Sequence, residues 1–294
     1  MSFIGRAADM NLTPVMVNGE PVSYLYTDDY SQIQYKELVS KQQDTTPYMG
    51  IFTRKTDNDN WTNAGVVSDN YKFIGNNVVL NGIRDSLSQI NQQIYLENTM
   101  LNDSLTYMHQ EIIIRNPQDI AEVGNIYPHI VVTNSYNGTA AITVNFGFSM
   151  IGNDGKISSS FSFRQKLAKM KQIHYASSKT TLSLAIGNYV QSFTDSIGEL
   201  IQSNMAQPLS EEDMLKSLDL VEKLGKKRRD EVSTYLSSIN PDGGAITVWK
   251  LFQAITKFSA ADTNINAKKV LENVIERVLL VPQRMISSLT VINS

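Results

Sequence analysis

Basic side chains are the residues in this sequence whose types and spacing are most suited to chemistry. Between Lys156 and Thr194 the chain carries six basic residues and no acidic one. Positive side chains neutralise phosphates, and the neighbouring Ser and Thr hydroxyls can hydrogen-bond phosphate oxygens. We therefore expect a polyanion to bind here, or else a solvated basic face that meets the acidic N-terminal part of a neighbouring subunit. The residues expected to contact the polyanion are Lys156, Arg164, Lys166, Lys169, Lys171, His174 and Lys179.

A second basic cluster follows Gly225 between two predicted helices. It consists of Lys226, Lys227, Arg228 and Arg229. Such a tetrad either binds phosphate or caps the C-terminus of the preceding helix. The adjacent Asp230 and Glu231 predict partial neutralisation within the cluster.

Aromatic residues precede the first basic segment. Phe161 and Phe163 alternate along the strand-like sequence KISSSFSFR and so share one face. Such rings can stack on unpaired bases or face a hydrophobic core, and we favour the core.

Signals for catalysis are absent from the sequence. His109, His129 and His174 lie far apart and outside any HxH or HExxH pattern, so surface or strand-end positions are expected for them. No GxSxG, GxGxxG or Walker motif occurs, and the pair Asp57 and Asp59 is typical of a solvated turn. With no cysteine, disulfide partners and thiolate metal sites are excluded. No cofactor or metal is expected, although a nuclease with turn carboxylates holding a metal stays a third possibility.

The pattern of strands and helices expected around these residues predicts an α+β fold. A helix is expected over 78–94, a buried strand at EIIIRNP, and a loop or helical turn over 118–123. The pieces HIVVT, TAAITVNFGFSMI and KISSSFSFR predict a central antiparallel β-meander, packed with a long helix over 182–204. Helices over 211–224, 228–239, 247–259 and 266–280 follow. Three parts result: 1–125 with mixed strands and helix, 126–206 with the meander, long helix and basic segment, and helical 207–294, which together can form one domain.

Composition agrees with a soluble intracellular protein. The chain has 294 residues, 41% hydrophobic and 19% charged, with no apolar run long enough to span a bilayer and no signal-peptide core. Its net charge of −3 is uneven. Residues 1–154 have 8 basic and 16 acidic side chains, and residues 155–294 have 18 basic and 13 acidic ones.

Three stretches together resemble the family called domain of unknown function 932. They are GVVSDNYKFIGN at 65–76, TNSYNGTAAITVNFGF at 133–148 and TVWKLFQAITKFS at 247–259. The family turn corresponds to Asn134, Ser135, Asn137 and Gly138; we expect Asn137-Gly138 to form a tight hairpin rather than to contact a ligand. The sequence departs from the family after Phe148, where MIGNDGKISSSFSFRQKL replaces the usual Arg and Cys–Gln–Asn stretch. The resemblance implies a phage or mobile-element origin and no particular activity.

The layout of a β-meander followed by a long helix is also similar to single-strand-annealing recombination proteins. Those form rings that hold single-stranded DNA without nucleotide hydrolysis. We therefore expect a phage-encoded, ATP-independent protein of the host cytoplasm that binds or anneals single-stranded nucleic acid as a homo-oligomer, with a ring as one arrangement. The alternative is an interaction protein, either a virion component or an inhibitor of host defence, whose acidic N-terminal part is the docking face.

Overall fold

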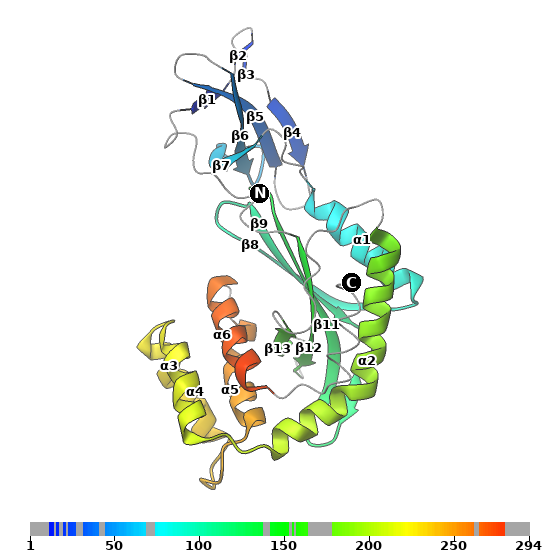
Figure 1. Ribbon diagram of the computed structural model, residues 1–294, viewed down its shortest axis with the longest axis vertical. Helices are drawn as coiled ribbons and strands as arrows, with labels where there is room; N and C mark the ends of the chain where they lie inside the picture. The colour runs from blue at the N-terminus through cyan, green and yellow to red at the C-terminus, as the bar shows by residue number, and fades with distance from the viewer. Residues whose placement is uncertain are drawn as a thin grey trace.

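The fold is seen in a computed structural model. It describes residues 12–14, 16–17, 20–21, 23–27, 32–40, 45–68, 74–137, 142–152, 155, 157–163, 178–261 and 265–279. The strands are β1 (Leu12–Pro14), β2 (Met16–Val17), β3 (Glu20–Pro21), β4 (Ser23–Thr27), β5 (Gln32–Ser40), β6 (Thr45–Arg54), β7 (Thr62–Ser68), β8 (Ile94–Leu101), β9 (Tyr107–Ile114), β10 (Gln118–Ile120), β11 (Gly124–Ser135), β12 (Thr143–Ile151) and β13 (Ile157–Phe163). The helices are α1 (Asn76–Gln89), α2 (Ser178–Ala206), α3 (Glu211–Glu222), α4 (Lys226–Ser238), α5 (Val248–Ala261) and α6 (Ile265–Val278). Apart from α1, the helices follow the strands in the chain, and the sheets are antiparallel, which confirms the predicted α+β class (Figure 1).

An antiparallel sheet of N-terminal strands lies at one end of the molecule (Figure 1). Its order is β1-β5-β6-β7, and β4 pairs with β5. The small core of this sheet includes Ile33, Ile51 and Val67, and it also contains the ring of Tyr136, which follows strand β11 of the other large sheet. Tyr136 is 1% exposed, so its burial helps to hold the two sheets together.

The central sheet has the strand order β13-β12-β11-β9-β8, with β10 paired to β11. All its neighbouring strands are antiparallel. Strands β11, β12 and β13 form the predicted meander, and β9 is the predicted EIIIRNP strand. Phe161 is fully buried against Phe148 and Phe252, which confirms its expected place in the core.

Two predictions about this sheet are wrong. The helix expected over 78–94 ends at Gln89, and Ile94 already begins strand β8. The segment 118–123, expected to be a loop or helical turn, contains β10, which pairs with the start of β11. Both β8 and β10 form because they pair with neighbouring strands. Such pairing cannot be inferred from the apolar periodicity of the segment itself.

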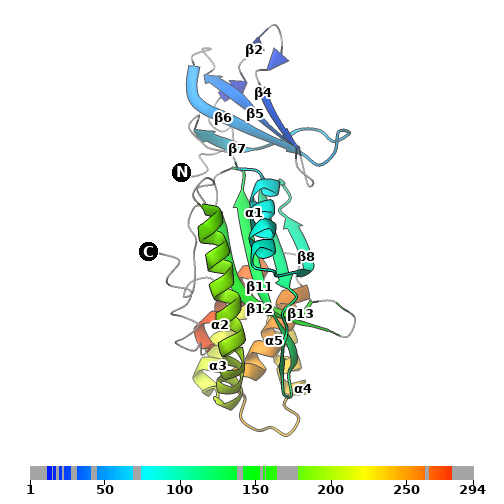
Figure 2. The same cartoon turned by 90° about the vertical axis from the view of Figure 1, so that its right-hand side faces the viewer.

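The two faces of the central sheet differ in polarity. Residues opposite one another on paired strands share a face, and alternate residues of one strand lie on opposite faces. On the apolar face, Phe146 stacks on Tyr189 of α2 at 4.5 Å between ring centroids, and Phe148 lies 5.3 Å from Phe252 of α5. Figure 2 shows α1 and α2 side by side along the sheet. The opposite face carries His109, Glu111 and other polar residues described below.

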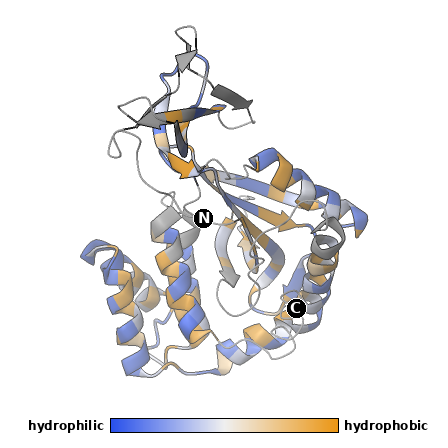
Figure 3. Ribbon diagram, turned by 45° about the horizontal axis from the view of Figure 1, so that its top comes forward, coloured by the Kyte–Doolittle hydropathy of each residue, from blue (hydrophilic) through white to orange (hydrophobic). Residues whose placement is uncertain are grey.

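The helices after residue 206 begin and end within two residues of the predicted bounds. Ser210 caps α3, because its hydroxyl accepts a hydrogen bond from the Asp213 backbone N–H at 3.1 Å. Gly225 separates α3 from α4 with a φ of 113°, a conformation that favours glycine. Figure 3 shows hydrophilic and hydrophobic residues on the helices of this part, as expected for amphipathic helices that bury one side. No helix in the described ranges has the length and apolar content needed to cross a membrane.

Candidate functional site

The first basic segment joins an edge of the central sheet to the longest helix. Strand β13, which ends at Phe163, is the last in the strand order, and α2 begins at Ser178. Lys179 lies in the first turn of α2. The other six expected contacts lie outside the described residues, so their predicted role stays a prediction. They are Lys156, Arg164, Lys166, Lys169, Lys171 and His174.

The second basic cluster, expected between two helices, instead forms the first turn of α4, which begins at Lys226. Arg229 reaches back to α3, where its guanidinium lies 2.6 Å from Glu222 and 3.5 Å from Asp219. Glu231 lies 3.3 Å from Arg228 and 4.0 Å from Lys227. The predicted partial neutralisation is therefore confirmed. Lys226 and Lys227 are the exposed members, and the Lys227 side chain is 92% exposed.

The family turn, which begins at the end of β11, binds the start of helix α1. The Asn134 side-chain amide donates to the Ile74 carbonyl at 2.9 Å and to the Asn76 side-chain oxygen at 3.0 Å. The Asn76 backbone N–H donates to the Tyr136 hydroxyl at 3.0 Å. Because an α-helix leaves its first N–H groups without partners in the helix, the turn satisfies a donor that α1 cannot satisfy itself.

The same turn also reaches the N-terminal sheet. Ser135 donates to the Asn137 side-chain oxygen at 2.8 Å, and the Asn137 amide donates to the Ala64 carbonyl of β7 at 3.2 Å. Asn134, Ser135 and Asn137 are all buried. The described β11–β12 pairing ends at Thr133 and Thr143. Gly138 lies outside the described residues, so the tight Asn137-Gly138 hairpin stays a prediction.

Replacing Asn134 by Ala is expected to lower the free energy of unfolding by about 2 kcal/mol. The change leaves buried carbonyl oxygens at the start of α1 without their donor, which costs roughly 1–3 kcal/mol. Urea denaturation followed by circular dichroism measures the effect. Asn188→Ala, at an exposed position of α2, is the matched control and should change stability by less than about 0.5 kcal/mol. Equal midpoints for the two variants would contradict the role of the turn.

A buried polar layer covers the second face of the central sheet; the name refers to His109, Glu111, His129 and Lys268. His109 and Glu111 alternate along β9, and the cross-strand pairing places His129 of β11 on the same face. Lys268 of α6 donates to the Glu111 carboxylate, and Asn98 of β8 donates to it at 2.9 Å. All four residues of the layer are at most 1% exposed. The layer therefore joins α6 to the sheet through an ion pair.

The two histidines of this layer correct the prediction from sequence. Surface or strand-end positions were expected, yet His109 and His129 are 0% exposed and lie within strands. His129 contacts the Ser149 hydroxyl at 3.1 Å through Nδ1. His109 Nε2 lies 3.8 Å from Glu111, which is longer than a hydrogen bond. His174 lies outside the described residues.

Burial and neighbouring charges shift two pKa values in the layer. Burial is the main cause that lowers the pKa of His129 to about 4; Lys268 and His109 add to this, and Glu111 opposes it. Burial by itself would raise the pKa of Glu111, but His109, Lys268 and His129 together hold it well below its usual range. Near neutral pH, Glu111 is therefore ionised and His129 neutral.

Sequence reasoning missed this layer, although it has a sequence signal. In YMHQEIII, polar His109 and Glu111 alternate with residues of the apolar face. Along α6, buried Lys268, Glu272 and Glu276 recur every four residues beside an apolar stripe. A polar stripe of this kind usually faces water, so only the observed packing reveals that it is covered.

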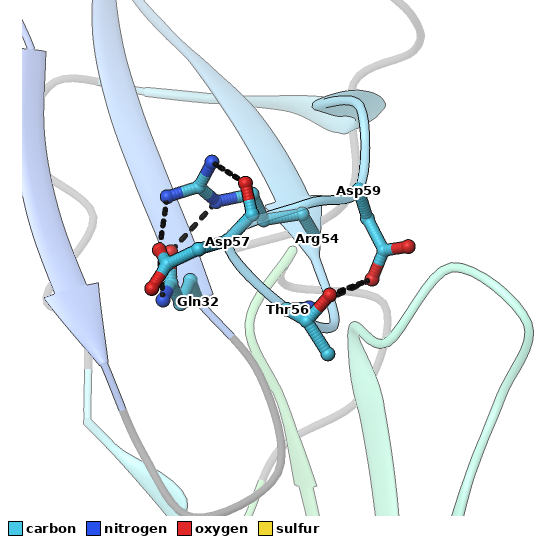
Figure 4. A network of polar contacts seen from close by, with 5 residues as sticks. All are labelled: Gln32, Arg54, Thr56, Asp57 and Asp59. Carbon is cyan, nitrogen blue, oxygen red and sulfur yellow. Dashed lines mark hydrogen bonds and ion pairs between the residues drawn. The ribbon is translucent and has the colours of Figure 1, made fainter.

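The paired acids Asp57 and Asp59 lie in the turn between β6 and β7, as predicted (Figure 4). Asp57 binds Arg54 at 2.7 Å, and its side chain is 79% exposed. Asp59 accepts hydrogen bonds from the Thr56 hydroxyl and backbone N–H, both at 2.8 Å, which lower its pKa. Within the described part of the chain, no group of three or more His, Asp or Glu side chains is arranged to hold a metal ion.

The family described as Domain of unknown function (DUF932) matches residues 63–277. The chain belongs to this family. The match confirms the resemblance seen in the three stretches of sequence. The DUF932 region begins within β7 and ends in the last turn of α6. It therefore includes the family turn, the basic segment, the second basic cluster and the buried polar layer, and leaves β1 to β6 outside. No curated protein and no solved structure matches the chain.

Proposed function

We propose that this protein binds single-stranded nucleic acid without nucleotide hydrolysis, and that it binds or anneals strands as a homo-oligomer. The observation that carries the proposal is the run of six basic residues, free of acids, between Lys156 and Thr194. Its ends adjoin an edge strand and a long helix, β13 and α2. Both adjoining elements pack into the main hydrophobic core, so bound nucleic acid would lie beside elements whose positions are fixed by packing.

The second basic cluster and the segment from 156 to 179 differ in how far acidic residues neutralise their charge. Arg228 and Arg229 form ion pairs with acidic residues of α3 and α4, so a large part of that charge stabilises the fold. The segment from 156 to 179 has no acidic residue of its own to neutralise it. A local field of one sign attracts polyanions even when the whole protein carries a net charge of −3. We also propose that the protein is phage-encoded and acts in the host cytoplasm, where single-stranded intermediates of replication and recombination occur.

Reversal of three lysines tests the proposal. Each phosphate contact releases about 0.7 counterion from a single strand, so four or five contacts give a log–log salt slope of about −3. Replacing Lys166, Lys169 and Lys171 by Glu should abolish binding of a fluorescein-labelled single-stranded oligonucleotide, measured by anisotropy across a salt series. Thermal unfolding should not change, because lysines are seldom buried without a partner.

The matched control carries the same charge change on exposed lysines elsewhere, in Lys55→Glu, Lys216→Glu and Lys223→Glu. It should keep most of the affinity. If the wild type shows no affinity for single-stranded DNA or RNA at low salt, the proposal is wrong, and the alternative of an interaction protein gains. If both triple variants lose binding equally, net charge rather than the basic segment is responsible.

A further inference from the structure

An open groove of about 600 Å³ lies where helices α4 and α5 meet. This volume is within the range of roughly 300–1,000 Å³ of small-molecule sites. The lining residues that matter for the argument are Lys226, Lys227, Asp230, Thr234, Tyr235 and Phe258. The groove thus combines ammonium groups, a hydroxyl, a carboxylate and two aromatic rings.

The two rings are held at a fixed angle. Tyr235 and Phe258 meet edge to face, with centroids 6.4 Å apart and an interplanar angle of 88°. The Lys257 ammonium lies 3.8 Å from the Tyr235 centroid, and the Arg228 guanidinium lies 5.5 Å from that of Phe258. Both rings are half-buried, so their positions are set by packing while part of their surface lines the groove. Each ring thus has a cation against it, and a nucleobase can contact the aromatic surface that these cations leave uncovered.

Ion pairing around the groove leaves Lys226 available for an anion. Glu231 is engaged by Arg228 at 3.3 Å and by Lys227 at 4.0 Å. Lys226 is exposed and has no ion pair among the described residues. The groove is lined by two cations, Lys226 and Lys227, and two carboxylates, Asp230 and Glu231, while Arg228 and Lys257 lie against its two rings.

We infer that this groove holds one nucleotide of a single strand, with the base against Tyr235 and Phe258 and the phosphate at Lys226 and Lys227. The inference rests on the proposed function and adds a base-contacting site to the electrostatic contacts of the segment from 156 to 179. Asp230 and Thr234 give the groove acceptors for the amino and imino groups of a base. The site is thus predicted to distinguish a strand with bases from a strand with phosphates alone.

Two variants of the full chain and two probes test the inference. Tyr235→Leu with Phe258→Leu removes both rings and keeps apolar side chains. It should weaken binding of a labelled single-stranded oligonucleotide about tenfold, as expected for loss of base stacking, and leave binding of an abasic strand of equal length unchanged. Lys226→Gln with Lys227→Gln, at exposed positions where folding is not at risk, should weaken binding of both strands. It should also make the salt slope shallower by about 1.4.

Lys216→Gln with Lys223→Gln is the control of equal charge change and should bind as the wild type does. Photocrosslinking of a strand that contains 5-iodouracil should label Tyr235 or Phe258. The inference is overturned if both groove variants bind the normal strand as tightly as the wild type, or if the crosslinks lie only outside α4 and α5. In either case the proposed function stands, provided that reversal of Lys166, Lys169 and Lys171 abolishes binding. If the wild type binds neither strand, both proposals fail.

Discussion

Replacing Lys268 by Met is expected to lower the free energy of unfolding by about 3–5 kcal/mol. Lys268 and Glu111 are each 1% exposed, and the ammonium group donates to the carboxylate across 157 positions of sequence. Removing one partner of a buried ion pair leaves the other charge buried without compensation, which costs about that amount. Asn98 stays hydrogen-bonded to Glu111, but its amide carries no charge. Urea denaturation at pH 7 measures the loss.

A double variant separates the loss of the ion pair itself from the cost of leaving the Glu111 charge buried without a partner. Lys268→Met combined with Glu111→Gln removes both charges, so it should be more stable than Lys268→Met alone and show a coupling of about 1–3 kcal/mol. The matched control is Lys216→Met in the exposed Lys216–Glu212 pair of α3, which should change stability by less than about 1 kcal/mol. An unfolding midpoint of Lys268→Met equal to that of the control would show that the buried pair does not hold α6 to the sheet.

The meander and the helices after residue 206 could be predicted because their signals are local. Strands β11 to β13 alternate in polarity, and Ser210 and Gly225 mark the ends of α3 by capping chemistry and backbone conformation. Phe161 was correctly placed in the core because it continues the apolar alternation of its strand. The family, too, was recognisable from three stretches of sequence, which all lie within residues 63–277.

The buried polar layer could not be predicted, because it depends on the pairing of distant segments. Alternation along β9 shows that His109 and Glu111 share a face, but it cannot show whether water or protein covers that face. The covering element is α6, whose own polar stripe contains Lys268. Each stripe alone is typical of a solvated surface, and only their contact makes them interior. Strand β8 was missed for the same reason, since its pairing with β9 rather than its own pattern defines it.

The two regions proposed to bind nucleic acid rest on different kinds of observation. The second basic cluster lies in the described part of the chain, where two of its four members form ion pairs shorter than 3.5 Å with acidic residues. This geometry gives Arg228 and Arg229 a structural role and leaves Lys226 and Lys227 as the members that we propose to bind nucleic acid. Sequence alone treated the four as equivalent. For the segment from 156 to 179, charge composition is the argument, and binding experiments are its direct test.

Acidification should destabilise the protein well above the pH at which most carboxylates titrate, and His129 should be responsible. The pKa of His129 is about 4 in the folded state because the ring is completely buried beside Lys268 and His109, whereas an unfolded histidine has a pKa of about 6.5. Between these values the unfolded chain binds a proton that the folded chain does not, so stability falls as pH falls. The expected loss between pH 7 and pH 5 is about 2 kcal/mol.

Urea midpoints of the wild type and of His129→Gln at these two pH values measure the effect. The variant should lose some stability at pH 7, because the ring fills a packed site, but it should lack most of the wild-type decline toward pH 5. Glu111 does not account for that decline. Because its pKa is lowered in the folded state, its contribution to the free energy of unfolding is lost only as pH falls below about 4.5, the ordinary pKa of Glu. His174→Gln removes a histidine from outside the described residues and is the control. A decline that persists in His129→Gln and disappears in His174→Gln would assign the titration to His174 and contradict the role of His129.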